Sequence, residues 1–246
     1  MARNCKLVPW IIGLLLLAVV PSVWALPSDL TDQIAKQDLA QPLRTVLVLT
    51  LLSIIPILLI SMTSFTRIVI VLSLLRHALG LPQAPPNSVI IALSICLTFF
   101  AMAPVADSVN QTALTPYLEK KIEAKEALAK ARIPVADFML RQTHESDLRA
   151  VLDMSHQPMP KTKADLQFST LVPAFMLSEL KTAFQIGFII FLPFLVIDLV
   201  VSAILMGLGM IMLPPTTISL PIKLLLFVLI DGWVLISRAL LSGIWN

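Results

Sequence analysis

The segment Met206-Gly-Leu-Gly-Met210-Ile-Met212-Leu-Pro214-Pro215 decides the fold, because it separates two long apolar stretches. Residues 187–205 carry one charge, and residues 218–236 carry two. Each stretch is close to the roughly 20 apolar residues that a helix needs to cross a bilayer. Paired prolines lack the amide donor and restrict the residue before them, so a helix ends here. The sequence therefore predicts a helical hairpin with the methionine-rich segment as its turn.

The charges inside this hairpin are placed symmetrically. Asp198 lies eight positions before Met206, and Lys223 lies eight positions after Pro215. At about 1.5 Å per residue, both side chains lie on the order of 12 Å from the turn. A lone charge in the middle of a bilayer costs roughly 2.5–3.5 kcal/mol on insertion scales. We therefore expect Asp198 and Lys223 to pair, within one subunit or between neighbours. A buried pair that only fixes packing is the equal alternative.

Composition places the chain among polytopic membrane proteins. Hydrophobic residues make up 57% of the sequence and charged residues 13%, whereas about 25% of residues are charged in soluble domains. The net charge of +3 includes Arg3 and Lys6, which belong to a predicted signal, so it does not indicate a nucleic-acid partner. Of the two cysteines, Cys5 would leave with that signal. The mature chain then has no intramolecular disulfide.

Residues 1–25 have the pattern of a secretory signal peptide. A positive start precedes a short apolar run, and small or β-branched residues precede a cleavage site between Ala25 and Leu26. The alternative is an uncleaved first membrane helix, for which the apolar run is short. Cleavage implies export across a bacterial inner membrane and a mature N-terminus outside the cytoplasm.

The rest of the chain divides into three parts. Residues 43–105 hold N-terminal hydrophobic helices, with spans expected at 43–62 and 89–105 and an apolar connection carrying Arg67 and Arg76. Residues 107–168 are a hydrophilic helical insert, with helices expected from about 118 to Ile133-Pro134, at 135–142 and at 146–154. Residues 170–246 hold an amphipathic segment, 170–184, and the hairpin.

Charge counting orients this arrangement. The connection 64–87 carries arginines and no acidic residue, which the positive-inside rule places in the cytoplasm. The insert 107–168 is then periplasmic, the hairpin turn faces the cytoplasm or a pore, and the C-terminus lies outside. The predicted fold class is an all-α membrane protein. It has about four hydrophobic helices in hairpins and a small helical periplasmic insert, after a cleaved signal peptide.

The sequence contains no motif for catalysis or nucleotide binding, so we expect no enzyme activity, no cofactor and no bound metal. The methionine turn is its sharpest local feature. Met206, Met210 and Met212 are soft and unbranched, and Gly207 and Gly209 supply backbone freedom, which suits a deformable constriction. Thioether ligands for Cu(I) are a second interpretation. Plain apolar loop residues are a third, and spacing alone favours it.

Two longer patterns resemble a known family. Pro173-Ala-Phe-Met-Leu-Ser-Glu179-Leu-Lys-Thr-Ala-Phe184-Gln-Ile-Gly187-Phe resembles the first signature of the FliP family of flagellar type III export-gate proteins. Pro221-Ile-Lys223-Leu, five apolar residues and Ile230-Asp231-Gly232-Trp233 resemble the second. Leu75-Arg-His-Ala-Leu-Gly80 with Pro85-Pro86-Asn87 is similar to the family's N-terminal core. The family-signature residues are Pro173, Phe175, Glu179, Phe184, Gly187, Pro221, Asp231, Gly232 and Trp233.

The resemblance implies a core subunit of the flagellar protein export gate in the inner membrane, at the flagellar basal body. It implies a ring-like or helical homo-oligomer, a pentamer by family likeness, with FliQ-like and FliR-like subunits. It also implies a FliO-like assembly factor and FlhA/FlhB-like export components, and unfolded polypeptides as substrates. By the same likeness, Met206, Met210 and Met212 belong to a gate loop, and Asp198 and Lys223 lie at inter-subunit contacts.

Three other functions compete with this expectation. Injectisome export gates share the same core, although the cleavable signal and the size of the insert favour the flagellar branch. A stand-alone small-solute or metal transporter would need polar groups at mid-membrane from a repeated half, and the sequence shows no such repeat. A membrane enzyme would need a paired acid and base, for which there is no candidate.

Overall fold

The computed structural model describes residues 45–245, apart from 47, 51, 54–56, 58–59, 82, 157, 159–165 and 211. The chain forms two compact units, Met1–Ile55 and Pro56–Asn246. In the first unit the described residues, which lie between 45 and 53, are helical. The predicted signal peptide and its cleavage site at Ala25 and Leu26 lie outside the described residues, as does much of the predicted first span. All regular elements described in the second unit are helices.

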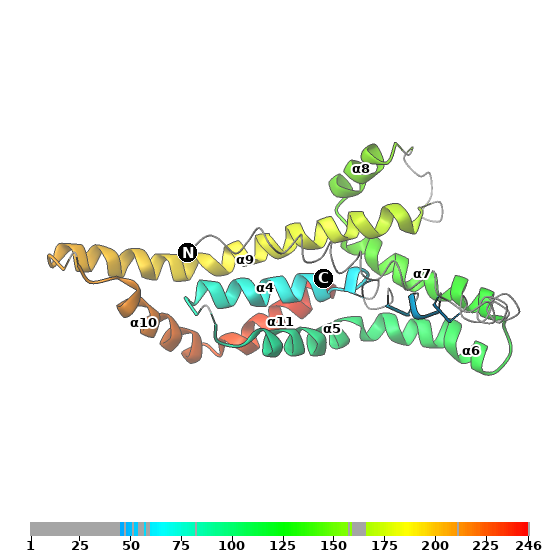
Figure 1. The fold of residues 1–246 in the computed structure, drawn as a ribbon, viewed down its shortest axis with the longest axis horizontal. Coiled ribbons are helices and arrows are strands. Elements are labelled where there is room, and N and C mark those ends of the chain that lie inside the picture. Colours follow the sequence, from blue (N-terminus) through cyan, green and yellow to red (C-terminus); the bar gives the residue numbers. More distant parts are fainter. Residues whose placement is uncertain are drawn as a thin grey trace, which may run out of the picture. The chain divides into compact units, whose positions relative to one another are not determined.

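Helix α4 (Phe65–Ala78) forms the core of the second unit. Ile68, Val71, Leu72 and Leu75 are fully buried, and their spacing of three and four residues makes one apolar stripe. Helices α9 and α5 lie against α4 (Figure 1). The sequence predicted a connection between two spans here. The structure makes this segment a core helix, because the apolar stripe outweighs the two arginines that flank it.

Helix α5 (Asn87–Val109) continues through a π-helical turn, Asn110–Leu114, into α6 (Thr115–Leu118). The predicted second span ended at residue 105, but the helix extends over 32 residues, Asn87–Leu118. Pro104 lies inside α5 and does not end it. The polar residues from Asp107 onward therefore prolong the same helical rod.

The insert is helical, as expected, but its boundaries differ. Helix α7 (Ala124–Gln142) runs through Pro134, so the prediction of a helix end at Ile133-Pro134 is wrong. A proline inside a helix removes one backbone hydrogen bond and strains its turn, and burial of Phe138 and Met139 on the next turn offsets that cost. Helix α8 (Glu145–Met154) matches the expected helix at 146–154 closely.

The C-terminal third consists of α9 (Phe168–Gly207), α10 (Thr216–Leu229) and α11 (Gly232–Trp245). The expected amphipathic segment 170–184 joins the hairpin in one 40-residue helix. The predicted span 218–236 is broken, because α10 and α11 meet at a bend of 63°. Among the described residues, two helices are long and apolar enough to span a membrane, or three if the bent pair counts as one span. The predicted number of about four included the first span, which is described only in part.

Candidate functional site

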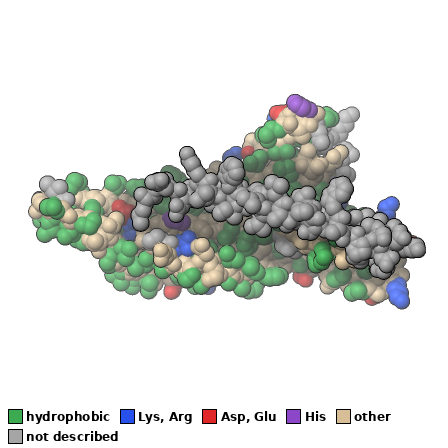
Figure 2. Space-filling model, in the orientation of Figure 1, with side chains coloured by type: hydrophobic (Ala, Val, Ile, Leu, Met, Phe, Trp, Pro, Cys, Tyr) green, Lys and Arg blue, Asp and Glu red, His purple; other side chains and the backbone are tan. Residues whose placement is uncertain are grey.

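The tip of the α9–α10 hairpin carries the methionine turn. Gly209 has φ +74°, and the amides of Gly209 and Met210 donate to the carbonyls of Met206 and Leu205. This pattern ends a helix with a left-handed residue that glycine adopts without strain. Met206, Met210 and Met212 are 65%, 51% and 100% exposed. The tip therefore presents soft apolar side chains outward, and Figure 2 shows hydrophobic atoms gathered at this end.

The two hairpin charges meet within one chain. Lys223 Nζ donates to Asp198 Oδ2 at 2.6 Å and to the carbonyl oxygen of Ala78 at 3.3 Å. The Lys223 side chain is buried, whereas that of Asp198 is 42% exposed. Ala78 is the last residue of α4, where helix carbonyls carry partial negative charge. The ammonium thus ties α10 to both α9 and the end of α4.

Glu179, from the first family signature, is fully buried in the middle of a polar network. Arg67 on α4 donates to both of its carboxylate oxygens. Arg67 also donates to Gln142 Oε1 on α7 at 2.8 Å and to the carbonyl oxygen of Gly243 on α11 at 3.4 Å. Gln142 Nε2 in turn donates to the carbonyl oxygen of Ile244 at 2.7 Å. This Arg67–Glu179–Gln142 network joins four helices.

Sequence reasoning missed Arg67 and Gln142 as site residues. It assigned Arg67 to a cytoplasmic connection by charge counting alone. A signal was present, because an arginine inside an apolar stretch requires a partner when it is buried. That partner, Glu179, lies 112 residues away in the sequence, so local patterns do not identify it.

Two signature glycines mark close approaches between elements. A Cβ atom on Gly187 would lie 2.3 Å from Leu74 Cδ1, so the Leu74 side chain of α4 packs directly on the α9 backbone there. A Cβ atom on Gly232 would lie 2.2 Å from the Phe227 ring. The preceding residue, Asp231, has φ +50°. The Asp231-Gly232 pair thus makes the tight bend between α10 and α11.

The remaining signature residues divide by burial. Phe175 is buried and its ring lies 5.9 Å from that of Phe138, in an edge-to-face arrangement. The Trp233 ring lies 5.4 Å from that of Phe227 and closes the α10–α11 bend. The other three, Pro173, Phe184 and Pro221, are exposed on α9 and α10, and their side chains join neither the network nor the bend.

Polar contacts dock α8 on α9. Ser178 Oγ donates to Asp147 Oδ2 at 2.8 Å and accepts from the amide of His144 at 3.0 Å. Lys181 Nζ lies 3.3 Å from Asp147 Oδ1. Burial by itself raises the pKa of Asp147. The Ser178 hydrogen bond, Lys181 and His144 outweigh it and hold that pKa below its usual value.

These contacts position helices rather than reactive groups. Among the described residues, no group of three or more His, Cys, Asp or Glu side chains could hold a metal ion. The buried charges each have a fixed partner on another helix. The apolar hairpin tip, in contrast, is exposed. The arrangement therefore holds the helices in place and leaves the apolar tip uncovered.

Comparison with known proteins agrees with the resemblance seen in the signatures. The model of the FliP family matches residues 48–240. The chain is 49% identical over 238 residues to the flagellar biosynthetic protein FliP of Pectobacterium carotovorum, covering 96% of this chain and 92% of that protein. It is 50% identical over 207 residues to that of Bacillus subtilis, covering 84% and 94%. It is 47% identical over 213 residues to that of Aquifex aeolicus, covering 86% and 89%.

Proposed function

The chain belongs to the FliP family, and we propose that it is a core subunit of the flagellar type III protein export gate. In this proposal it forms, with FliQ-like and FliR-like subunits, the conduit for unfolded flagellar substrates across the inner membrane. It contributes no covalent chemistry. The apolar helices and the flagellar relatives support a membrane-embedded component of the export apparatus.

The observation that carries the proposal is the uncovered hairpin tip. Met212 is completely exposed, and a Cβ atom added at Gly207 or Gly209 would have no neighbour within 4 Å. Large side chains along α9, such as Phe184, Phe188 and Leu199, are also mostly exposed. Apolar surface on this scale marks a contact with lipid or with other subunits. A ring of such chains would bring several methionine loops together.

The gate follows from the chemistry of methionine. The thioether side chain is flexible and polarizable, so it repacks against many shapes. Several loops carrying Met206, Met210 and Met212 would close a narrow conduit to ions and yield when an unfolded polypeptide passes. The glycine hinges at Gly207 and Gly209 would permit that movement. Energy would come from the proton motive force and a separate ATPase complex.

The partners and the topology belong to the same proposal. The chain would assemble as a pentameric ring or helical turn with help from a FliO-like protein, and would work beside FlhA/FlhB-like components. Signal cleavage after Ala25 would leave the N-terminus in the periplasm. The polar insert that contains α7 and α8, and the C-terminus, would also be periplasmic. The inter-subunit role expected for Asp198 stays a proposal, since its contact with Lys223 lies within one chain.

The test is ion leakage through an assembled gate. Met210→Ala combined with Met212→Ala should raise leakage of potassium or of a small dye across cells or proteoliposomes that contain the gate. Met154→Ala is the matched control, because Met154 is 67% exposed but lies on α8, outside the loop. Gate assembly is checked by native gel electrophoresis. Normal assembly with unchanged leakage would remove the loop from the seal.

Two alternative functions have their own tests. If the chain is an injectisome gate subunit, it would restore secretion of injectisome substrates in cells that lack their own injectisome gate subunit. It would not restore motility in cells that lack their own flagellar gate subunit. A copper transporter would accumulate copper through its methionines in cells without other export components. Restored motility with unchanged copper content supports the flagellar gate.

A further inference from the structure

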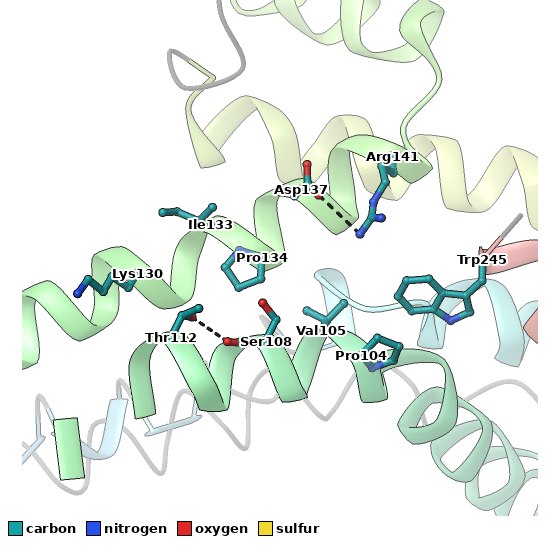
Figure 3. A pocket seen from close by; sticks show the side chains of 10 residues that line it. All are labelled: Pro104, Val105, Ser108, Thr112, Lys130, Ile133, Pro134, Asp137, Arg141 and Trp245. Atoms are coloured by element: carbon teal, nitrogen blue, oxygen red, sulfur yellow. Dashed lines mark hydrogen bonds and ion pairs between the residues drawn. The ribbon is translucent and has the colours of Figure 1, made fainter. Parts of the chain in front are cut away.

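A cavity of about 740 Å³ lies between α5 and α7, and none of its lining residues belongs to the hairpin tip or to the Arg67–Glu179–Gln142 network. Figure 3 shows Pro104, Val105 and Ser108 of α5 facing Pro134 and Arg141 of α7, with the Trp245 ring at one end. Pro134 has no amide hydrogen to donate inside its helix. Pro134 lines the middle of the cavity, whose wall combines apolar surface with a few polar groups.

The cavity begins where the apolar part of α5 ends. Residues 89–105 carry no charge, and their helical length of about 26 Å nearly matches a hydrocarbon core of about 30 Å. Asp107 follows at once. Pro104 and Ser108 therefore lie near the boundary between the acyl chains and the lipid headgroups. Trp245 fits this depth, because tryptophan concentrates at membrane interfaces.

The charge at this end of the cavity is a guanidinium beside an aromatic ring. Arg141 Cζ lies 5.8 Å from the centroid of the Trp245 ring. The Arg141 side chain is 56% exposed, and its pair with Asp137 is long, at 3.6 Å. An exposed pair of this kind contributes roughly 0–1 kcal/mol, so Arg141 can bind another anion. Arginine binds phosphate through two parallel hydrogen bonds.

We propose that this cavity binds the headgroup of an anionic phospholipid, with its phosphate on Arg141 beside Trp245. The hydroxyl of Ser108 lies on the facing wall and can contact the polar end of the headgroup. The acyl chains leave the cavity past Pro104 and lie on the surface of α5 over Phe100. The Phe100 side chain lies one turn before Pro104 on the same side of the helix and is 67% exposed. The site requires only that the chain lies in a membrane and is independent of the export proposal.

Lys130 provides a matched control. It lines the same cavity and carries the same charge, but it lies eleven residues before Arg141 on α7, about 16 Å away along the helix axis. It pairs with Glu126 at 2.9 Å. A phosphate held by Arg141 does not reach Lys130. Attraction by the general positive charge of α7 would use both residues equally.

The experiment measures binding of phosphatidylglycerol to the purified, full-length chain in detergent, counted by native mass spectrometry. Arg141→Gln should weaken binding by at least about tenfold, the loss of one charge-assisted contact. Lys130→Gln should stay within about twofold of the original chain, and Arg141→Lys should keep most of the binding. Phosphatidylcholine and glycerol phosphate, titrated in parallel, should bind more weakly than phosphatidylglycerol.

Several results would overturn the proposal. Undiminished binding by Arg141→Gln, or equal losses for Lys130→Gln and Arg141→Gln, would contradict a phosphate site at Arg141. Equal binding of phosphatidylcholine would show that the charge plays no part. Glycerol phosphate that binds as tightly as the lipid would make this a site for free phosphate. Circular dichroism of each variant checks the fold, and none of these results bears on the methionine gate.

Discussion

Removing the carboxylate of Glu179 should destabilise the protein strongly, because it would leave Arg67 charged and buried without its ionic partner. Both side chains are almost fully buried. Breaking such a pair from one side costs about 3–5 kcal/mol, a large part of the roughly 5–15 kcal/mol that holds a domain folded. Arg67 would keep two neutral acceptors, Gln142 Oε1 and the carbonyl oxygen of Gly243. We therefore expect Glu179→Ala to cost about 3 kcal/mol, the lower end of that range.

The assay is thermal unfolding of the full-length chain in detergent, followed by helical circular dichroism. A loss of about 3 kcal/mol should lower the midpoint by on the order of 10 °C. Glu119→Ala is the control, because it breaks an ion pair of 2.7 Å with Lys121 in which both side chains are exposed. Exposed pairs contribute roughly 0–1 kcal/mol, so this variant should unfold within about 3 °C of the original chain.

A double variant separates the lost pair from the lost side chain. Arg67→Met together with Glu179→Met removes both charges at similar volume, and replacements of this kind are often neutral or stabilising. Gln142 keeps its hydrogen bond to the carbonyl oxygen of Ile244. The double variant should therefore be more stable than Glu179→Ala. If Glu179→Ala proved as mild as Glu119→Ala, or if the double variant were no more stable than Glu179→Ala, the network would not hold the core as argued.

Three further predictions follow from the same contacts. Gly232→Ala should cost about 1–3 kcal/mol by forcing a methyl group against the Phe227 ring. Adding Phe227→Leu to Gly232→Ala should recover part of that loss. Gly243→Ala is the control, because a Cβ atom there has no neighbour within 4 Å, and it should be neutral in the same melting assay. Asp147→Asn should lower stability at pH 6–8. The difference in stability between the two chains should shrink as pH falls below the usual carboxyl pKa of 3.8 and vanish below the lowered pKa of Asp147. The reason is that the Asp147 carboxylate stabilises the fold only while it is ionised. Asp198→Ala and Lys223→Ala should each reduce the yield of assembled gate on native gels. The exchange Asp198→Lys with Lys223→Asp should rescue only in part, since a carboxylate at 223 faces the carbonyl end of α4; an exchange no better than either single variant would count against pairing.

The hairpin was predictable because its signals are local. Paired prolines and a glycine turn ended one helix and began the next, and spacing alone put Asp198 and Lys223 at equal distances from the turn. The structure joins these two side chains. The bend at Asp231-Gly232 also had a local signal, since Asp-Gly is a common turn dipeptide. The sequence analysis did not use that signal and predicted one continuous span over 218–236.

The core was less predictable because it depends on contacts between distant segments. Charge counting placed Arg67 and Arg76 in a connection, and it gave no weight to the apolar stripe between them. Arg76 donates to Asn87 Oδ1 at 2.6 Å and to the carbonyl oxygen of Pro85 at 3.2 Å, so it fixes the turn into α5. Arg67 thus has an ionic partner inside the protein, and Arg76 has neutral acceptors for one end of its guanidinium. Charge counting therefore does not show which of these arginines is buried in the core, and the cytoplasmic side assigned to this segment stays a prediction.

Buried charges fix α9 to α4 at two levels, which leaves the hairpin tip as a separate arm. Arg67 binds Glu179 near the start of α4, and Lys223 binds both Asp198 and the last carbonyl of α4. Beyond Asp198, α9 buries only Val201 and Leu205 before the turn. The methionine loop can therefore change conformation without breaking either ionic contact. The proposed gate would need this division, because its seal would have to yield to each substrate while the subunit keeps its place in the assembly.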